Sequence, residues 1–456
     1  MTGLPPKPPA RSGRVSLWRY MRLFRQDILS AQPARLYRAW MAEFRTPFFR
    51  SYLCNQPELV NLVLRDRPED FPKSERVREG LTPLLGNSVF VTNGETWKRQ
   101  RRIIDPAFEG GRLRDAFPAM LRAGQSAVAR LKVQAEGEPV EIEAQTSHVA
   151  ADVIFQTLFS LPIEDEIAAR VFAEFRAHQR TQPVVNIAAF LPLPRWVPRL
   201  HSRATKATAK RIRTLITHLT ARRMAEIEAG TAPDDLATKI MTATDPESGD
   251  RFDTEEMVDQ VAIFFLAGHE TSASALAWSL YLLAMYPDWQ EKVAREALEV
   301  IPNGDAEFRD MNRLRVVRDV FREALRLYPP VPMMVRETAK GERLRDRDVQ
   351  PGSQVVLSPW HLHRHERLWV RPDAFDPDRF SSENGKTCLR EAYIPFSAGP
   401  RVCSGAGFAM IEGTLLLSML VGAYRFDLVP DRPAIPVAHL TVRGKDGIWL
   451  KITPRH

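Results

Sequence analysis

Residues 396–405 read FSAGPRVCSG and place a single cysteine, Cys403, among glycines and other small residues, with Arg401 just before it. The chain has only 3 cysteines. Cys54, Cys388 and Cys403 could form at most one disulfide, and their spacings match no zinc motif. We interpret Cys54 and Cys388 as incidental thiols or small buried hydrophobes. The glycines and the arginine around Cys403 indicate that it is a functional residue.

The composition of the chain is ordinary for a globular protein, with 44% hydrophobic and 26% charged residues. Its 456 residues exceed the roughly 250 to 300 at which one hydrophobic core stops growing, so we expect two domains or one unusually large domain. The sequence has no run of about 18 consecutive apolar residues, so we expect no transmembrane anchor. Residues 1–30 lack the features of a secretory signal, which favours a cytoplasmic protein.

The formal net charge is +8, but lysine and arginine are interspersed with aspartate and glutamate along the chain. A nucleic-acid groove is usually marked by a basic block with interleaved aromatic residues. We therefore expect no nucleic-acid partner.

The first 30 residues form a distinct arm. Residues 1–13 are Pro-rich and are predicted to be extended or partly disordered. Residues 14–29, RVSLWRYMRLFRQDIL, mix arginine with apolar residues. This pattern fits an arm packed on the protein body or a basic amphipathic helix on a membrane, and we favour the packed arm. Because the chain has no repeats and no long Gly/Ser linker, residues 31–456 are predicted to form a single large domain.

Apolar periodicity predicts a mainly α fold with a smaller β-rich part. The expected helices span residues 112–135, 147–160, 163–178, 201–229, 254–286, 289–300 and 316–328. The expected strands span residues 48–54, 139–144 and 354–358, with others near the C-terminus.

The longest expected helix begins at Thr254, which we interpret as its N-cap, and ends at Tyr286. Its centre reads FFLAGHETSAS, residues 264–274. Gly268 costs about 1 kcal/mol relative to alanine in a helix interior, and Thr271 can bond back to the carbonyl four residues earlier. The pattern fits either a packing contact at the glycine or a functional opening in the helix.

Further motifs flank this helix in the sequence. Glu323 and Arg326 lie three residues apart on one helical face, a spacing that permits an ion pair. Arg379 follows in the Pro-punctuated stretch RPDAFDPDRF. Upstream, GETWKRQRRIIDPAF places Trp97 four residues before Arg101.

In this order, from about residue 90 to 443, the motifs resemble those of the cytochrome P-450 family of heme-thiolate monooxygenases, in its soluble bacterial form. The family signature around the cysteine is matched by Phe396, Gly399, Arg401, Cys403 and Gly405. AGHET, the Glu323 and Arg326 pair, Arg379, and the Trp97 and Arg101 pair match other family motifs. The resemblance implies a heme between the long central helix and the cysteine loop.

The resemblance also implies roles around heme b, the iron protoporphyrin IX cofactor. Cys403 is the proximal metal ligand, and a thiolate ligand favours O–O cleavage. Gly399 and Gly405 let the backbone approach the sulfur, and Phe396 screens it. The implied partners of the two heme propionates are Trp97, Arg101, Arg336 and Arg401. Glu323, Arg326 and Arg379 are implied to form a scaffold rather than to act in catalysis.

On the opposite side of the heme, the implied catalytic residues are Thr271 and Glu270, which hold oxygen and an ordered water at a widened helical turn and relay protons. His269 is interpreted as a helix-face residue without a catalytic role. Residues 180–203 are expected to form a mobile lid. The expected substrate pocket consists of Phe264, Ala267, Val331, Met333 and Leu440.

The implied activity is insertion of one oxygen atom from O2 into a lipophilic small molecule, such as a fatty acid, a terpenoid or an aromatic compound. The sequence carries no flavin, nicotinamide or iron–sulfur motif. Electrons are therefore expected from a ferredoxin or flavodoxin with its NAD(P)H-dependent reductase, docked near Lys98, Arg99 and Arg102. The alternatives are a peroxide-using or non-oxidative heme-thiolate enzyme, and a noncatalytic heme-binding sensor.

Overall fold

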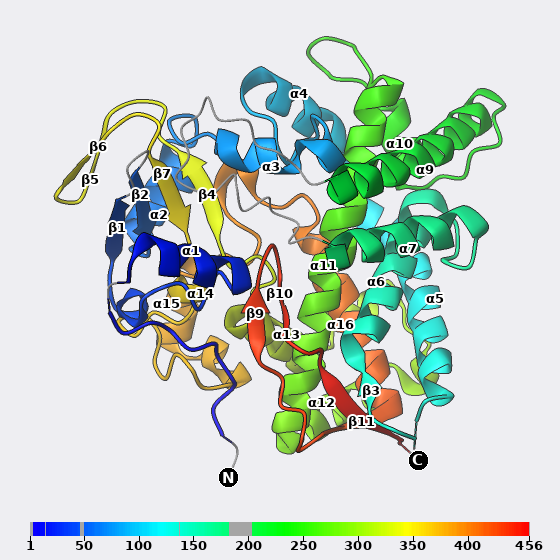
Figure 1. Ribbon diagram of the computed structural model, residues 1–456. Helices are drawn as coiled ribbons and strands as arrows, with labels where there is room; N and C mark the ends of the chain where they lie inside the picture. Colours follow the sequence, from blue (N-terminus) through cyan, green and yellow to red (C-terminus); the bar gives the residue numbers. More distant parts are fainter. Residues whose placement is uncertain (1–2, 14, 46–49, 136, 182–202, 456) are drawn as a thin grey trace.

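The computed structural model describes residues 3–13, 15–45, 50–135, 137–181 and 203–455 (Figure 1). The longer helices are α1 (Leu17–Gln26), α3 (Glu75–Leu85), α4 (Gly94–Ile104), α5 (Arg112–Lys132), α6 (Ile142–Phe159), α7 (Glu166–Thr181), α9 (Arg203–Glu228), α11 (Thr254–Met285), α12 (Pro287–Val300), α13 (Arg315–Leu327), α15 (Glu383–Glu391) and α16 (Ala406–Ala423). Short helices are α2 (Pro57–Asn61), α10 (Leu236–Thr242) and α14 (Pro359–Leu362).

The strands form small sheets. A four-stranded sheet has the order β1 (Met41–Arg45), β2 (Arg50–Cys54), β7 (Gln354–Leu357) and β4 (Met334–Glu337), and only its β2 and β7 pair is parallel. A three-stranded sheet has the order β3 (Val140–Glu141), β11 (Trp449–Pro454) and β8 (Tyr424–Leu428). Two hairpins pair β5 (Glu342–Leu344) with β6 (Arg347–Val349) and β9 (Pro436–Ala438) with β10 (Val442–Gly444).

The predicted fold class is confirmed: Figure 1 shows the four-stranded sheet on one side and the large helices on the other, with α11 running through the helical part. The expected helix at residues 147–160 begins earlier than predicted, at Ile142. The Glu141 side chain accepts hydrogen bonds from the Glu143 and Ala144 amides and so caps α6. The predicted strand at residues 139–144 is therefore wrong for its second half, because β3 ends at Glu141.

Helix α11 is capped one residue earlier than the sequence suggests. The Asp253 carboxylate accepts from the Glu256 amide at 2.8 Å, and the Glu256 carboxylate accepts from the Asp253 amide at 3.1 Å. This reciprocal pair is a capping box, so the prediction of Thr254 as the N-cap is wrong. The helix has 32 residues and is about 48 Å long, which lets it cross the whole helical part.

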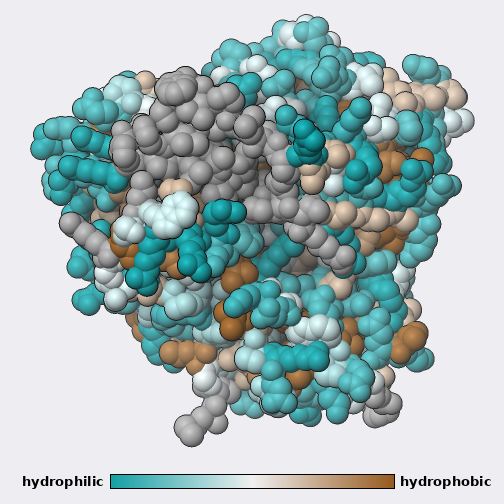
Figure 2. Space-filling model, viewed as in Figure 1, coloured by the Kyte–Doolittle hydropathy of each residue, from teal (hydrophilic) through white to brown (hydrophobic). Residues whose placement is uncertain are grey.

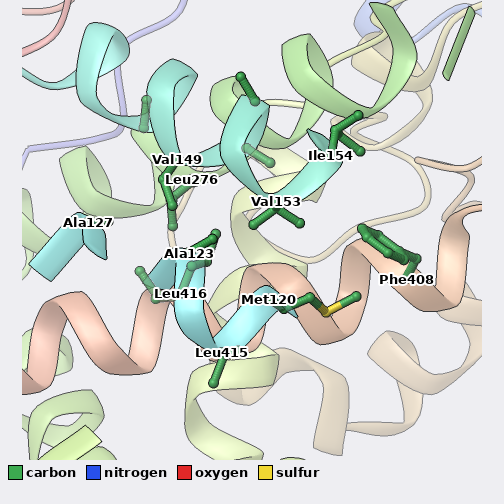
Figure 3. Packing of buried hydrophobic residues seen from close by; sticks show 14 of the residues in the cluster. Met120, Ala123, Ala127, Val149, Val153, Ile154, Leu276, Phe408, Leu415 and Leu416 are labelled. Carbon is green, nitrogen blue, oxygen red and sulfur yellow. The ribbon is translucent and has the colours of Figure 1, made fainter. Parts of the chain in front are cut away.

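The helical core lies where α5, α6, α11 and α16 meet (Figure 3). Side chains from these helices interlock there, including Met120, Val153, Leu276 and Leu416. Among the described helices, α16 alone is long and apolar enough to span a membrane by length and composition, but most of it is buried in this core. Its apolar character follows from packing on several sides, because a helix that is hydrophobic all round is stable only when surrounded.

Gly268 of α11 belongs to this core packing. A Cβ atom at this position would lie 2.3 Å from the Ile154 Cδ1 atom of α6. The glycine therefore permits close approach of α6 and α11, which is the packing alternative drawn from the sequence. In the described chain α11 runs as a continuous α-helix through this region, so the widened turn implied by the resemblance is not seen.

Residues 3–13 of the N-terminal arm have irregular backbone structure and pack on the body. Pro5 and Pro8 are buried. The Tyr286 hydroxyl donates to the Gly3 carbonyl at 2.8 Å, and the Tyr328 hydroxyl donates to the Pro6 carbonyl at 2.8 Å. The expected lid at residues 180–203 lies, except at its ends, outside the described residues.

Candidate active site

A cavity of about 490 Å³ lies between α11 and the loop that precedes α16. Thr271 of α11 and Cys403 of the loop are both on its wall. The five residues expected to contact substrate, Phe264, Ala267, Val331, Met333 and Leu440, also line it. They come from α11, from the segment before β4 and from the β9–β10 turn, so elements far apart in sequence build one wall.

The cysteine loop is held by its own backbone. The Cys403 amide donates to the Phe396 carbonyl at 2.9 Å, which closes the loop between the first residue of the motif and the thiol. Burial raises the pKa of the Cys403 thiol, and the Gly405 amide opposes this effect by donating toward the sulfur. The exposed surface of Cys403 faces the cavity.

The two glycines of the motif have different structural roles. A Cβ atom on Gly405 would lie 3.9 Å from the Cys403 sulfur, so this residue does bring backbone close to the thiol. Gly399 has a φ of +67°, and a Cβ there would lie 1.8 Å from the Leu64 carbonyl oxygen. Gly399 therefore permits a close contact between this loop and the segment after α2, and its expected role near the sulfur stays a prediction.

Cationic side chains surround the cavity near Cys403. Arg336 is 5% exposed, and among the described residues its guanidinium has only a 3.4 Å contact, with the carbonyl of its neighbour Val335. Burial lowers the pKa of Arg336 to about 10, and burial together with the charges of Arg336 and Arg101 lowers that of Arg401 to about 9. These groups lack acidic partners in the cavity wall, whose one acid among the described residues is Glu412. Such a set fits a ligand that brings carboxylates, as heme does.

The four predicted propionate partners lie together. Arg401 donates to the Asn93 side-chain oxygen at 2.9 Å, and its guanidinium lies 4.1 Å from the centre of the Trp97 ring. Arg101 bonds to Asp105 at 2.8 Å and to the Val402 carbonyl at 2.8 Å, which ties α4 to the cysteine loop. Because Arg101 already has an acidic partner, it has less need of a ligand carboxylate than Arg336 has.

Lys73 is a site residue that the sequence reasoning missed. Its ammonium group donates to the Phe90 carbonyl and lies 3.8 Å from the centre of the Phe90 ring. Burial and the charges of Arg336, Arg401 and Arg101 lower its pKa well below the usual range. It lies outside every motif, and only the fold brings it to Arg336 and Arg401.

Thr271 faces the cavity, whereas Glu270 lies behind it. The Thr271 hydroxyl donates to the Ala267 carbonyl at 2.5 Å, within α11. The Glu270 carboxylate pairs with Arg443 at 2.6 Å and accepts from the Thr441 hydroxyl at 2.6 Å. Glu270 is 4% exposed and does not belong to the cavity wall. The two residues are adjacent in sequence but point to different sides of the helix.

His269 is placed as a packing residue. Its Nε2 atom lies 2.7 Å from the Ser147 hydroxyl, and its ring packs edge-on against Phe172. Burial, reinforced by nearby arginines, lowers its pKa to about 3. The residue is therefore neutral at physiological pH and lies off the cavity wall.

A second residue missed from the sequence is Glu412 of α16, which lines the cavity and is 1% exposed. One carboxyl oxygen accepts from the Ser272 hydroxyl at 2.6 Å, and the other has no partner in the structure. Burial raises the pKa of Glu412 to about 8. The side chain is thus a neutral acid at pH 7, and nothing in its apolar helix indicates this.

The raised pKa makes stability depend on pH. Between about pH 4.3, the ordinary value for glutamate, and the folded value of about 8, the folded state binds the proton and the unfolded state does not. Rising pH through this window therefore destabilises the wild type relative to Glu412→Gln, by up to about 1.4 kcal/mol per pH unit. Urea unfolding at several pH values measures the difference.

Glu299→Gln, which alters an exposed glutamate of α12, serves as the control and should show a flat difference across the same pH window. A flat difference for Glu412→Gln as well would mean that Glu412 is ionised in the folded protein.

Glu323, Arg326 and Arg379 come together as a buried cluster away from the cavity. Glu323 and Arg326 are 0% exposed and bond through both guanidinium branches, at 2.7 and 2.8 Å. Arg379 donates to the same carboxylate at 2.9 Å. The remaining donors of Arg326 bind the carbonyls of His363, Pro372 and Ala374, so the cluster fixes the meander that leads to the cysteine loop.

The three residues expected to dock an acidic redox protein are already paired. Arg99 bonds to Glu256 at 2.6 Å, Arg102 to Asp245 at 2.6 Å, and Lys98 to Glu69 and Glu95 at 3.0 Å. These ion pairs reduce the free positive charge of this face, and its expected role in docking a redox partner stays a prediction.

A thiol that faces an apolar cavity, with uncompensated arginines at the edge and a helix threonine opposite, defines a heme-thiolate site. The family model Cytochrome P-450 matches residues 43–451. The chain belongs to the cytochrome P-450 family and is a heme-thiolate monooxygenase.

Relatives with known names support the assignment over most of their length. Cyclooctatin synthase of Streptomyces melanosporofaciens is 32% identical over 84% of this chain and 82% of its own. Cyclooctat-9-en-7-ol 5-monooxygenase of the same organism is 31% identical over 92% of this chain and 88% of its own. A cytokinin hydroxylase of Arabidopsis thaliana is 28% identical over 88% and 78%. A crystal structure of a cytochrome P-450 heme domain shares the fold, with a TM-score of 0.82 at 24% identity over 99% of this chain and 98% of its own.

Proposed function

We propose that this enzyme inserts one oxygen atom from O2 into a lipophilic small molecule, by hydroxylating a C–H bond or epoxidising a double bond. The cavity carries the proposal: apolar residues such as Phe264, Val331 and Leu440 share it with Thr271 and the Cys403 thiol. Mostly apolar walls with few polar groups favour a lipophilic ligand. Relatives named for the oxidation of cyclooctat-9-en-7-ol and the hydroxylation of cytokinins support a small organic substrate.

Different protein residues bind the iron and the carboxylates of the cofactor. When bound, the heme supplies the iron that activates dioxygen, with Cys403 as its thiolate ligand. Arg336, Arg401 and Lys73 hold the heme carboxylates, because their charges have no acidic partner nearby. Trp97 supports Arg401 through the face of its ring.

On the opposite wall, Thr271 holds a proton at its hydroxyl oxygen. In releasing its bond to the Ala267 carbonyl, it can donate into the cavity. Glu270 can resupply this proton only through water, because its carboxylate lies behind α11 in contact with Arg443. The Arg443 side chain is 37% exposed, which connects this pair to solvent.

We infer that electrons come from a ferredoxin or flavodoxin with its NAD(P)H-dependent reductase. We also infer that residues 31–456 act as one catalytic domain and that the enzyme works in the cytoplasm. Because Lys98, Arg99 and Arg102 are already in ion pairs, other residues near the cysteine loop are also candidates for the docking surface of the electron donor.

Thr271→Ala tests the proposed role of the hydroxyl. A substrate is first found by the spin-state change it causes in a screen of lipophilic compounds. We expect the variant to bind this substrate as the wild type does, while product per electron falls by at least about tenfold and hydrogen peroxide rises, because proton delivery is impaired. Product, peroxide and consumed reductant are measured in the same reaction.

Thr271→Ser, which keeps a hydroxyl, is the matched variant and should retain most of the coupling. Unchanged coupling in Thr271→Ala would contradict the relay. A protein that binds heme but shows no spin-state change with any compound would favour the sensor alternative, and product formation from peroxide alone would favour a peroxide-using enzyme.

A further inference from the structure

Helix α1 forms part of the cavity wall. Tyr20, Met21 and Phe24 line the cavity from one face of this helix, and the Tyr20 and Phe24 rings are 5.7 Å apart. These positions recur at helical spacing, so one side of α1 is apolar and faces the protein. An α-helix is only about 10 Å across, so anything in contact with its outer side lies next to the substrate cavity.

The helix is fixed to the C-terminal hairpin. Asp27 ends α1, and its carboxylate accepts from the Ala438 amide at 2.8 Å. The Ile28 amide donates to the Ala438 carbonyl at 2.9 Å. Ala438 ends β9, directly before His439 and Leu440, which line the cavity. The position of α1 is therefore coupled to residues that contact the proposed substrate.

The outer side of α1 is basic and carries a tryptophan. Trp18 is 77% exposed, and Arg19, Arg22 and Arg25 are exposed. Within the described residues, none of these three arginines makes an ion pair, unlike Arg99, Arg102 and Arg443. Figure 2 shows hydrophilic side chains over the part of the surface that α1 occupies in Figure 1.

A cluster of unpaired arginines next to an exposed tryptophan suits the interface of an anionic lipid bilayer. Arginine is attracted to anionic head groups, and a tryptophan ring is most stable at the level of the head groups. An acidic protein surface would satisfy the arginines and bury the tryptophan as well, so the choice between the two occupants rests on the position of α1. An electron donor must also reach the cysteine loop, which contacts α4 through Arg101, whereas α1 is joined to β9.

We propose that the outer face of α1, formed by Trp18, Arg19, Arg22 and Arg25, docks the enzyme on an anionic lipid surface. Docking places the α1 wall of the cavity against the bilayer, so that a lipophilic substrate enters from the membrane. The entry route rests on the lipophilic substrate proposed above; the docking itself does not, because it follows from the charges and exposure of α1.

The test uses the full-length holoprotein and vesicles of phosphatidylcholine alone or mixed with an equal part of phosphatidylglycerol. We expect binding to the mixed vesicles that weakens with salt, and little binding to phosphatidylcholine. Each arginine near an anionic surface contributes roughly a fivefold gain in affinity, so Arg19→Gln/Arg22→Gln/Arg25→Gln should bind on the order of 100-fold more weakly. Co-sedimentation measures the affinity, and the heme spectrum verifies that each variant is folded.

The matched control Arg295→Gln/Arg390→Gln/Lys451→Gln removes the same charge from three exposed residues on α12, α15 and β11, and should bind within about twofold of the wild type. An equal loss in both triple variants would overturn the proposal, because net charge would then explain the binding. Equal affinity for both vesicle types would also overturn it.

The Trp18→Phe variant gives an independent readout. Brominated lipid should quench the fluorescence of the wild type more than that of Trp18→Phe, because the indole lies in the head-group layer. If the α1 triple variant binds vesicles normally but loses reduction by its electron donor, the face serves an acidic protein and the lipid proposal is wrong. Vesicle binding needs no substrate, so it can fail or succeed independently of the proposed reaction.

Discussion

We expect Cys403→Ser to abolish the red-shifted Soret band that the wild-type protein should show when reduced and exposed to carbon monoxide, and to lower turnover to background. The serine hydroxyl does not ionise near neutral pH, so it cannot replace the thiolate that distinguishes this heme environment. The substitution is nearly isosteric, and the loop is closed by the Cys403 amide rather than by the sulfur, so the chain still folds. Difference spectroscopy of the reduced protein with and without carbon monoxide measures the change.

Cys54→Ser and Cys388→Ser provide matched controls, because both thiols are buried outside the cavity. Burial raises the pKa of Cys54 to about 12 and that of Cys388 to about 11, which keeps both as neutral thiols. Each control should keep the red-shifted band. A Cys403→Ser protein that keeps the band would refute the assignment of Cys403 as the ligand.

Glu323→Gln is expected to cost about 3 to 5 kcal/mol of folding free energy, because it leaves Arg326 and Arg379 buried without a counter-charge. Such a loss is a large part of the roughly 5 to 15 kcal/mol by which a domain is stable. We therefore expect little soluble holoprotein and a low heme content. Urea unfolding and the ratio of heme to protein measure the effect.

Helix α13 offers an internal control for this prediction. Arg322 pairs with Asp319 at 3.1 Å on the half-exposed side of the same helix. Arg322→Gln should change stability by less than about 1 kcal/mol, because partly exposed pairs contribute little. A Glu323→Gln protein with wild-type stability and heme content would show that the buried cluster is not needed for the fold.

The sequence was most informative where all the residues of an interaction lie within one short motif. The spacing of Glu323 and Arg326 predicts a pair on one helical face, and the structure joins them. The order of FSAGPRVCSG, AGHET and the tryptophan motif predicted the family, and the family model confirms it. Helix periodicity located α5, α11, α12 and α13, because an amphipathic or fully apolar stretch of that length has few other stable states.

Local reasoning failed where a residue's role depends on a distant neighbour. A Cβ atom on Gly399 would meet the Leu64 carbonyl oxygen, a contact that no local pattern indicates. Arg99 and Arg102 pair with Glu256 and Asp245 from distant parts of the chain, whereas Lys98 pairs with Glu69 and with the neighbouring Glu95. Lys73 and Glu412 belong to no motif, so only their positions in space connect them with the cavity.

The sequence by itself determined the class of chemistry. Each heme-thiolate motif is short, and the residues within one motif act close to one another along the chain. The tertiary structure decided which charges are free and which are paired. A charge is neutralised by whatever lies within about 4 Å, and that neighbour is often more than a hundred residues away, as Glu270 and Arg443 illustrate. Among the described residues, charges that have no acidic partner include Arg336 and Arg401 at the cavity, and Arg19, Arg22 and Arg25 on the outer side of α1.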